Sequence, residues 1–364
     1  MLRPRAAIHR IVDSLILLVV ILFGSMLHAG DTPANALLVL SKGDNTLTIV
    51  DPSSLQVVAR IPAGHDPHEV TASADGKTAF VSNYGFGAYS TLAVVDLVAQ
   101  KALPAIDLGA LRGPHGLTFV GGKAWFTAEA AKAIGRYDPT TGKVDWILGT
   151  GQNRTHMLYV SPDMSWIVTT NVSSATVSII EKAAPGWERP GAPPPGRPPR
   201  PIQGSPGPGG TTNGGDWNET VVPVGNGSEG FDVSPDGKEI WVANAQDGTV
   251  SIIDVFRKKV TQTLAADVGG ANRLKFTPDG KLALVSTLGG PNLTVIDAST
   301  RKTIKRIPVG HGAAGIVVQP DGLRAFVACS PDGYVAVVDL HSLEQVGRIE
   351  VGEDPDGMAW VTRH

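Results

Sequence analysis

The sequence contains almost no cysteine: Cys329 is the only one in 364 residues. One thiol cannot form an intrachain disulfide, and it excludes both a cysteine-rich metal site and haem attachment through a cysteine pair. A phosphate-cradling glycine loop and a Ser-His-Asp arrangement are absent as well, which removes the common nucleotide-binding and serine-hydrolase motifs. Because Cys329 ends the apolar run that starts at Ala325, we expect a buried small hydrophobic side chain rather than a reactive thiol.

An excess of positive charge is also missing. The chain has 31 Lys and Arg residues against 34 Asp and Glu residues, which gives a net charge of −3. No segment gathers the basic residues into a stripe. We therefore expect no nucleic-acid partner, because binding to phosphates depends on clustered Lys and Arg.

Long apolar runs are missing except for one near the start, Leu15–Phe23. Three arginines precede this run and small residues follow it up to Ala29, an order that predicts a secretory signal peptide over residues 1–29 and a short linker over residues 30–36. The alternative is an uncleaved membrane anchor, but Asp13 shortens the run below the length of a spanning helix. We expect an exported protein, periplasmic or extracellular, with no membrane span in the mature chain.

What the sequence does contain is a repeat. A short apolar run that ends in an acidic residue occurs seven times, at intervals of 42 to 45 residues apart from one interval of 73. The acidic residues are Asp51, Asp96, Asp138, Glu181, Asp254, Asp297 and Asp339. Such a unit, with four short strands between turn signals, predicts an all-β, seven-bladed β-propeller of four-stranded blades over residues 37–364. The acidic residues are expected to cap the turns that follow them.

The two ends of the repeat region are complementary. Residues 37–61 supply only three strands, and the segment from Asp356 onward supplies one. We expect the C-terminal strand to complete the N-terminal blade, which closes the ring without an open sheet edge. The long interval contains a Pro- and Gly-rich insertion over residues 183–216, which predicts a disordered loop between the third and fourth strands of blade four.

Three second-strand segments carry a resemblance to a known family: Phe80–Asn83, Ile167–Asn171 and Trp241–Asn244, with turns such as Ser234–Gly237. They resemble the YVTN-type propeller repeat. The resemblance implies a secreted or envelope-facing seven-bladed propeller, similar to surface-layer proteins and to the propellers of nitrous oxide reductase and haem-binding nitrite reductases. The family has no single activity, and blade three departs from it with Gly121-Gly122 in place of Pro-Asp-Gly.

One position repeats at the start of every innermost strand, and we expect its side chains to surround one mouth of the central channel. The seven residues are His68, His115, His156, Glu229, Asn272, Ala314 and Asp356. Imidazole and carboxylate groups are good ligands for a divalent transition metal, so His68, His115, His156 and Glu229 form a candidate metal site. Turn residues that hydrogen-bond a neighbouring blade, and acid-base catalysis without metal, are the alternatives.

Five further residues are candidates for ligand binding. Arg154 and Arg273 flank the ring and suit a carboxylate or phosphate group, with a salt bridge between blades as the alternative. Tyr84, Phe86 and Tyr89 belong to a glycine-spaced loop that either forms a wall or lid over the mouth or packs on blade three.

Two functional interpretations follow from these patterns. The first is a monomeric binding or interaction module for a protein or small-molecule ligand. The alternative is a metal-dependent lyase or lactone hydrolase in which the histidine ring holds the ion. A third interpretation, a haem-handling or electron-transfer subunit, has less support because a covalent haem motif is absent.

Overall fold

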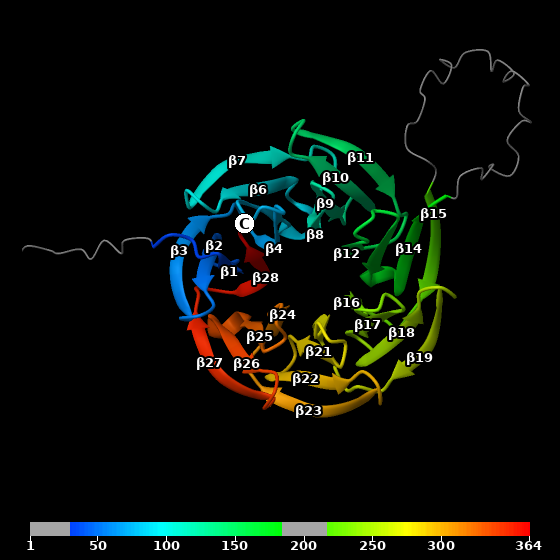
Figure 1. Ribbon diagram of the computed structural model, residues 1–364. Coiled ribbons are helices and arrows are strands. Elements are labelled where there is room, and N and C mark those ends of the chain that lie inside the picture. The colour runs from blue at the N-terminus through cyan, green and yellow to red at the C-terminus, as the bar shows by residue number, and fades with distance from the viewer. Residues whose placement is uncertain (1–29, 184–216) are drawn as a thin grey trace, which may run out of the picture.

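The computed structural model describes residues 30–183 and 217–364, and these form seven four-stranded antiparallel sheets in a ring (Figure 1). The prediction of an all-β, seven-bladed propeller is thereby confirmed. The predicted signal peptide, and all of the predicted disordered insertion except residue 183, lie outside the described residues. Within the described residues, no helix is long and apolar enough to cross a membrane.

Each blade has an innermost strand, two middle strands and an outer strand. The innermost strands are β28 (Pro355–Thr362), β4 (Pro67–Ala72), β8 (Pro114–Val120), β12 (Thr155–Val160), β16 (Ser228–Val233), β20 (Ala271–Phe276) and β24 (Ala313–Val318). The second strands are β1 (Asn35–Ser41), β5 (Thr78–Asn83), β9 (Lys123–Ala128), β13 (Trp166–Asn171), β17 (Glu239–Asn244), β21 (Leu282–Thr287) and β25 (Arg324–Cys329).

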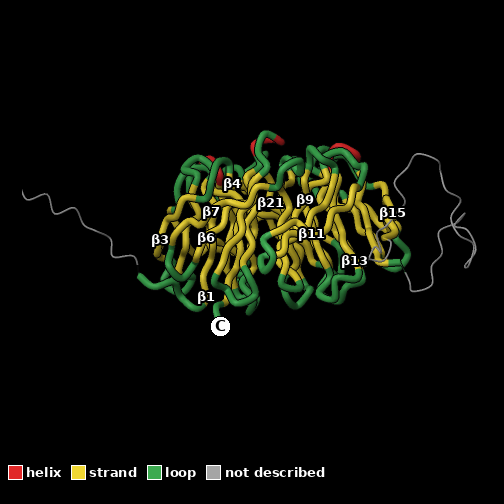
Figure 2. Tube along the Cα trace, turned by 90° about the horizontal axis from the view of Figure 1, so that it is seen from above, coloured by secondary structure: helices red, strands yellow, loops and turns green. Residues whose placement is uncertain are grey.

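The third strands are β2 (Thr46–Asp51), β6 (Thr91–Asp96), β10 (Ala133–Asp138), β14 (Thr176–Lys182), β18 (Thr249–Asp254), β22 (Asn292–Asp297) and β26 (Tyr334–Asp339). The outer strands are β3 (Gln56–Pro62), β7 (Lys101–Asp107), β11 (Lys143–Gly149), β15 (Trp217–Pro223), β19 (Lys259–Leu264), β23 (Lys302–Pro308) and β27 (Glu344–Glu350). Three 3-10 turns, η1 (Gly85–Gly87), η2 (Val172–Ser174) and η3 (Ser330–Asp332), follow second strands, and Figure 2 shows the short helical turns on one face of the ring.

The core lies between blades, in the middle strands. β1 is buried from its second residue onward, because one face packs on each neighbouring blade. Outer strands such as β7 are exposed along most of their length. Continuous apolar runs therefore mark the middle strands, since a strand that is buried on both faces has no polar side. Cys329 is fully buried, and burial raises the pKa of its thiol to about 12, which confirms the expected role as a core side chain.

The ring closes as the sequence predicts. β28 pairs with β1 in antiparallel register from Asn35 opposite Thr362 to Ser41 opposite Pro355. The predicted linker is shorter than expected, because β1 begins at Asn35. Thr32 in that linker is buried and its hydroxyl donates to the Leu97 carbonyl at 2.5 Å, so the segment packs on blade two.

The six aspartates at the ends of the third strands cap turns, as expected, whereas Glu181 in blade four instead contacts Lys258. The backbone amide of Ser53 donates to Asp51 at 2.8 Å, and that of Thr300 donates to Asp297 at 2.7 Å. Such bonds satisfy turn amides that no ladder reaches. Hydrogen bonding therefore accounts for these carboxylates without a catalytic role.

Candidate functional site at the channel mouth

The seven ring positions share one backbone feature. In every blade the pairing of the innermost strand with the second strand shifts register just after the first residue, so the ring residue lies in a β-bulge. In blade two, for example, Pro67 pairs with Asn83 and Glu69 with Ser82, and His68 between them has no partner. A bulge turns a side chain away from the regular pleat. The repeat thus presents one side chain per blade at the mouth.

Glycines below the ring bring neighbouring blades together. A Cβ atom at Gly116 would lie 2.4 Å from the carbonyl oxygen of His156, and one at Gly357 would lie 2.1 Å from that of His68. Only glycine allows this approach, because a side chain there would overlap the next strand's backbone. The close packing holds adjacent ring residues within contact distance.

The three histidines predicted from the sequence lie together. The ring centroids of His68 and His115 are 4.9 Å apart, and those of His115 and His156 are 3.8 Å apart. His115 and His156 are each only 2% exposed. The mouth therefore contains a row of adjoining imidazoles, tilted with respect to one another, on the side formed by blades two, three and four.

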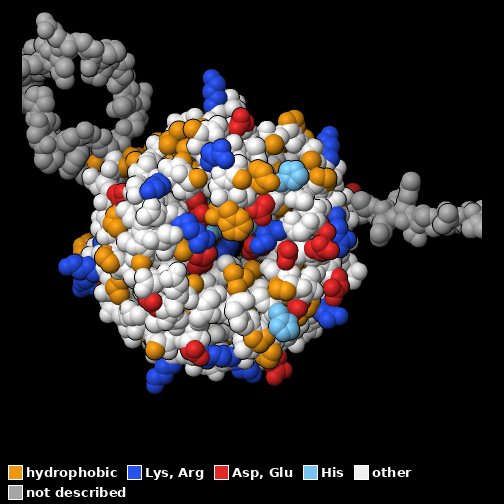
Figure 3. Space-filling view, turned by 180° about the vertical axis from the view of Figure 1, so that it is seen from behind, with side chains coloured by type: hydrophobic (Ala, Val, Ile, Leu, Met, Phe, Trp, Pro, Cys, Tyr) orange, Lys and Arg blue, Asp and Glu red, His pale blue; other side chains and the backbone are white. Residues whose placement is uncertain are grey.

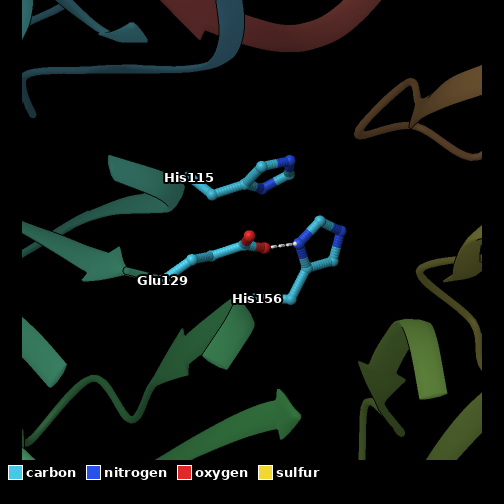
Figure 4. Close-up of side chains that lie close together, drawn as sticks. All are labelled: His115, Glu129 and His156. Carbon is cyan, nitrogen blue, oxygen red and sulfur yellow. Dashed lines mark hydrogen bonds and ion pairs between the residues drawn. The ribbon is translucent and has the colours of Figure 1, made fainter. Parts of the chain in front are cut away.

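Sequence reasoning missed one acidic residue of the site, Glu129. This residue directly follows β9, and its carboxylate contacts Nδ1 of His156 and accepts a hydrogen bond from the Tyr84 hydroxyl at 2.5 Å. His115, Glu129 and His156 each offer a ligand atom within 4.8 Å of the others, and Figure 4 shows their side chains converging. Of the predicted metal ligands, His68 and Glu229 are not part of this group of three.

A sequence signal for Glu129 exists in the repeat. The position directly after the second strand forms another ring of seven residues: Lys42, Tyr84, Glu129, Val172, Ala245, Leu288 and Ser330. Blades one to three have long polar groups there, whereas blades four to six have apolar ones. We call the ring residues together with Lys42, Tyr84, Glu129 and Arg154 the cup.

Charge in the cup is concentrated around His156. Its Nδ1 faces Glu129 and its Nε2 lies 3.1 Å from a Glu229 oxygen. Burial lowers the pKa of His156, but the two carboxylates outweigh it and raise that pKa above its ordinary value. Burial disfavours ionised Glu229, but the charges of His156, Arg154 and Arg273 lower its pKa to about 2. The two carboxylates therefore favour the protonated form of His156.

His115 has the opposite environment. Burial, followed by the nearby positive charges of His156 and His68, holds its pKa well below the usual value. It is a neutral imidazole, and its Nδ1 is buried without a hydrogen-bond partner among the described residues. His68 Nδ1, His156 Nε2 and Asp356 Oδ1 are further buried atoms of this kind, although Asp356 Oδ2 accepts from Lys42 at 2.8 Å.

A salt bridge crosses the channel below the cup. Arg273 on β20 contacts Glu69 on β4, and both side chains are buried. Blades six and two are not neighbours in the ring, since β20 packs against β16 and β24 and β4 against β28 and β8. An open pocket of about 390 Å³, with both polar and apolar lining residues, lies at the other ends of β16, β20, β24 and β28.

The two candidate arginines thus differ in accessibility. Arg273 is committed to Glu69, which is the salt-bridge alternative, but the bridge spans the channel instead of joining adjacent blades. Arg154 lies 3.6 Å from Glu129 and 3.4 Å from Glu229, and its side chain is 39% exposed. These contacts join neighbouring blades and so match the salt-bridge alternative for Arg154 too, while its partial exposure leaves the side chain accessible to an incoming group.

The three aromatic residues of the loop at the mouth differ in how deeply they are buried. Tyr84 is buried, with its ring 4.8 Å from that of His68 and 4.9 Å from that of His115. Phe86 is 85% exposed and sits 5.2 Å from Tyr84, with a left-handed φ of 50°. Figure 3 shows a hydrophobic ring over the centre of this face among charged groups. Tyr89 stacks on His65 further out.

Comparison with known proteins gives one partial family match. Residues 214–323 match the model of the cytochrome D1 heme domain family. No curated protein matches the chain.

Solved structures resemble the whole ring. A functionally unknown protein from Desulfotomaculum acetoxidans DSM 771 has a TM-score of 0.70 at 13% identity, covering 91% of this chain and 100% of its own. A putative 6-phosphogluconolactonase from Bacteroides uniformis ATCC 8492 has a TM-score of 0.68 at 15% identity, covering 90% and 99%. Dihydro-heme d1 dehydrogenase NirN in complex with DHE has a TM-score of 0.61 at 16% identity, covering 91% and 76%.

These likenesses show the propeller fold, and they leave the chemistry to the residues. The matched segment contains one histidine, His311, whose side chain is 77% exposed and lies 3.2 Å from Asp332. The three histidines of the cup all lie outside it. The seven-bladed propeller is therefore the level at which this chain resembles its relatives.

Proposed function

We propose that this protein is a ligand-binding propeller of the cell envelope that receives a small polar molecule in the cup. The observation that supports the proposal is a set of four buried, unpartnered polar atoms on the cup wall: His68 Nδ1, His115 Nδ1, His156 Nε2 and Asp356 Oδ1. Leaving such atoms without a hydrogen bond costs about 1 to 3 kcal/mol each, which a ligand's polar groups would recover. The apolar N-terminal run predicted as a signal peptide supports export.

The walls of the cup indicate how such a ligand would be held. Arg154 and Lys42 are partly exposed cations at the mouth, with side-chain exposures of 39% and 26%. Phe86 offers an exposed aromatic face above them. A molecule with an anionic group and a flat or apolar part would meet both kinds of contact.

The proposal is tested by native mass spectrometry of the mature protein purified gently from the periplasm. We expect a discrete small-molecule mass on the parent protein and on His311→Ala, which changes an exposed histidine outside the cup. The mass should be lost in the double variant His68→Ala/Arg154→Ala. A parent protein without bound mass, and without thermal stabilisation by a periplasmic small-molecule extract, would contradict the proposal.

Haem, which the names of two comparisons suggest, does not fit inside the cup. The imidazoles of His115 and His156 lie 3.8 Å apart by centroid, and Tyr84 packs on His115 from the side. A flat macrocycle has no slot between these rings. The only histidine of the matched segment, His311, has a side chain that is 77% exposed and lies beside the Asp332 carboxylate.

A metal-dependent lactone hydrolase is the second candidate, because two imidazoles and a carboxylate converge at the mouth. Such a donor set resembles those of hydrolytic zinc sites, where the ion activates water. Turnover of a phosphorylated sugar lactone that disappears with EDTA and returns with Zn²⁺ would support this candidate. Turnover unaffected by chelator, or absent with every divalent ion, would eliminate it.

A further inference from the structure

We propose that His115, Glu129 and His156 bind one divalent transition-metal ion, and that Glu229 holds His156 in the orientation that this requires. The inference rests on the proposed ligand site, because the ion would form part of the cup. It replaces the ligand set expected from the repeat, which contained His68 and omitted Glu129.

The first support is the arrangement of atoms around His156. Nδ1 of this residue faces a Glu129 oxygen, while Nε2 lies 3.1 Å from a Glu229 oxygen. A histidine that binds a metal through one nitrogen usually donates the other N–H to a carboxylate, which fixes the ring and raises its basicity. Glu229 lies close enough to Nε2 for that positioning role, although the two groups do not form a hydrogen bond in this arrangement. Nδ1 is directed at the carboxylate that would share the ion.

The second support is His115. Its side chain is 2% exposed, and its Nδ1 has no hydrogen-bond partner within residues 30–183 and 217–364. The group formed by His115, Glu129 and His156 keeps one ligand atom of each residue within 4.8 Å of the others. A buried lone pair that no proton donor satisfies is explained if an ion is its partner.

The donor types select the kind of ion. Two nitrogens and one carboxylate suit Zn²⁺, Fe²⁺, Cu²⁺ or Ni²⁺, whereas Ca²⁺ and Mg²⁺ prefer oxygen ligands throughout. Three protein ligands leave at least one coordination position for a bound molecule. Arg154 contacts both Glu129 and Glu229, so an anionic group on that molecule would meet the ion and the guanidinium together.

A purely structural reading competes with this one. Protonated His156 between Glu129 and Glu229 is an ion network that needs no metal, although its Nε2 has no hydrogen-bond partner among the described residues. The two readings differ in what the cup does when a metal is offered. A structural network excludes the ion, whereas a metal site exchanges the proton between His156 and Glu129 for it.

The experiment uses the full mature protein, treated with EDTA, dialysed and titrated with Zn²⁺ by isothermal calorimetry. We expect one Zn²⁺ per chain, with unchanged affinity in the control His311→Ala. Changing His115 or His156 to Ala, or Glu129 to Gln, should weaken binding by about 100-fold or more, because two remaining ligands hold zinc poorly. His68→Ala should cost much less than Glu129→Gln, which is the reverse of the ordering that the repeat alone predicts.

Positioning by Glu229 has its own readout. Glu229→Gln should weaken Zn²⁺ binding by about 10- to 100-fold and alter the visible absorption of the Co²⁺-substituted protein, since the ring of His156 loses its carboxylate partner. Thermal unfolding of each variant separates loss of the site from loss of the fold.

Absence of Zn²⁺ and Co²⁺ binding to the folded parent would overturn the metal inference, as would a folded Glu129→Gln variant that binds like the parent. Because the small-molecule experiment above is read without added metal, a bound ligand in a protein that takes no metal would leave the proposed function standing. If the parent protein binds neither a small molecule nor a metal ion, both the proposed function and the metal inference are overturned.

Discussion

The two sides of the channel mouth have the same backbone and different chemistry. Blades two to five place His68, His115, His156 and Glu229 at the ring position, whereas blades six and seven place Asn272 and Ala314 there. The β-bulge is present on both sides. The repeat therefore fixes where a side chain points, and the residue at that point decides what the mouth can bind.

The residues directly after the second strands show the same difference between the two sides of the mouth. Lys42, Tyr84 and Glu129 reach into the cup from blades one to three, while Val172, Ala245 and Leu288 at the same position in blades four to six are apolar. The site is accordingly off-centre, in the sector where both rings carry polar groups. A propeller becomes asymmetric in function without becoming asymmetric in fold.

We expect the largest effect from removing β28, the strand that closes the ring. Truncation before Asp356 deletes β28, exposes the inner edge of β1 and opens the ring. We expect loss of cooperative unfolding, amounting to most of the roughly 5 to 15 kcal/mol of a native domain. Calorimetry of the truncated protein measures this. A monomeric truncation that melts like the parent would refute closure by β28.

The polar side of the mouth should be more sensitive than the other side. Glu129→Ala leaves His156, Tyr84 and Arg154 without a shared carboxylate, and we expect it to lower the free energy of unfolding by about 3 to 5 kcal/mol. Asn272→Ala removes one hydrogen bond from Arg273 and should cost about 1 kcal/mol. Urea unfolding of both variants compares the sides, and equal costs would contradict the contrast.

The bridge between the two sides can be tested by a double-mutant cycle. Glu69→Ala leaves the buried Arg273 guanidinium without its carboxylate partner and should lower the free energy of unfolding by about 3 to 5 kcal/mol. Adding Arg273→Met should recover most of that loss, since the pair is replaced by apolar groups. Additive losses measured in the double variant would show that the two residues do not act as a pair.

Acid should weaken the Glu229 side selectively. The folded pKa of Glu229 is lowered to about 2 from an ordinary 4.5, so its stabilisation is present above pH 4.5 and is lost as the pH falls toward 2. We expect this carboxylate to contribute roughly 2 to 3 kcal/mol of the unfolding free energy lost over that interval, and Glu229→Gln to flatten the pH profile. Parallel profiles of parent and variant would argue against the assignment.

The smallest effect is expected far from the mouth, in blade four. β14 and β15 pair along their whole length, from Thr176 opposite Pro223 to Lys182 opposite Trp217. Replacing residues 185–215 by a short glycine-containing turn should change the unfolding free energy by less than about 1 kcal/mol. Thermal unfolding and Zn²⁺ titration of the deletion, both close to the parent, would support a separable insertion.

The sequence predicted the architecture because the repeat is local. Apolar runs, turn residues and the intervals between acidic residues sufficed for seven blades, their strand order and the closure by the segment from Asp356. The start of β1 at Asn35 was missed, since Thr32 packs on blade two through a contact 65 residues away that no local pattern marks.

The sequence by itself determined the propeller and the row of histidines at its mouth, because both recur at a fixed interval. Tertiary structure alone decided which groups meet there: Glu129 approaches His156 from another blade, and Arg273 reaches across the channel to Glu69. These partners are 27 and 204 residues apart. The distance across a closed ring depends on how all seven blades pack, so the sequence of a single repeat does not determine it.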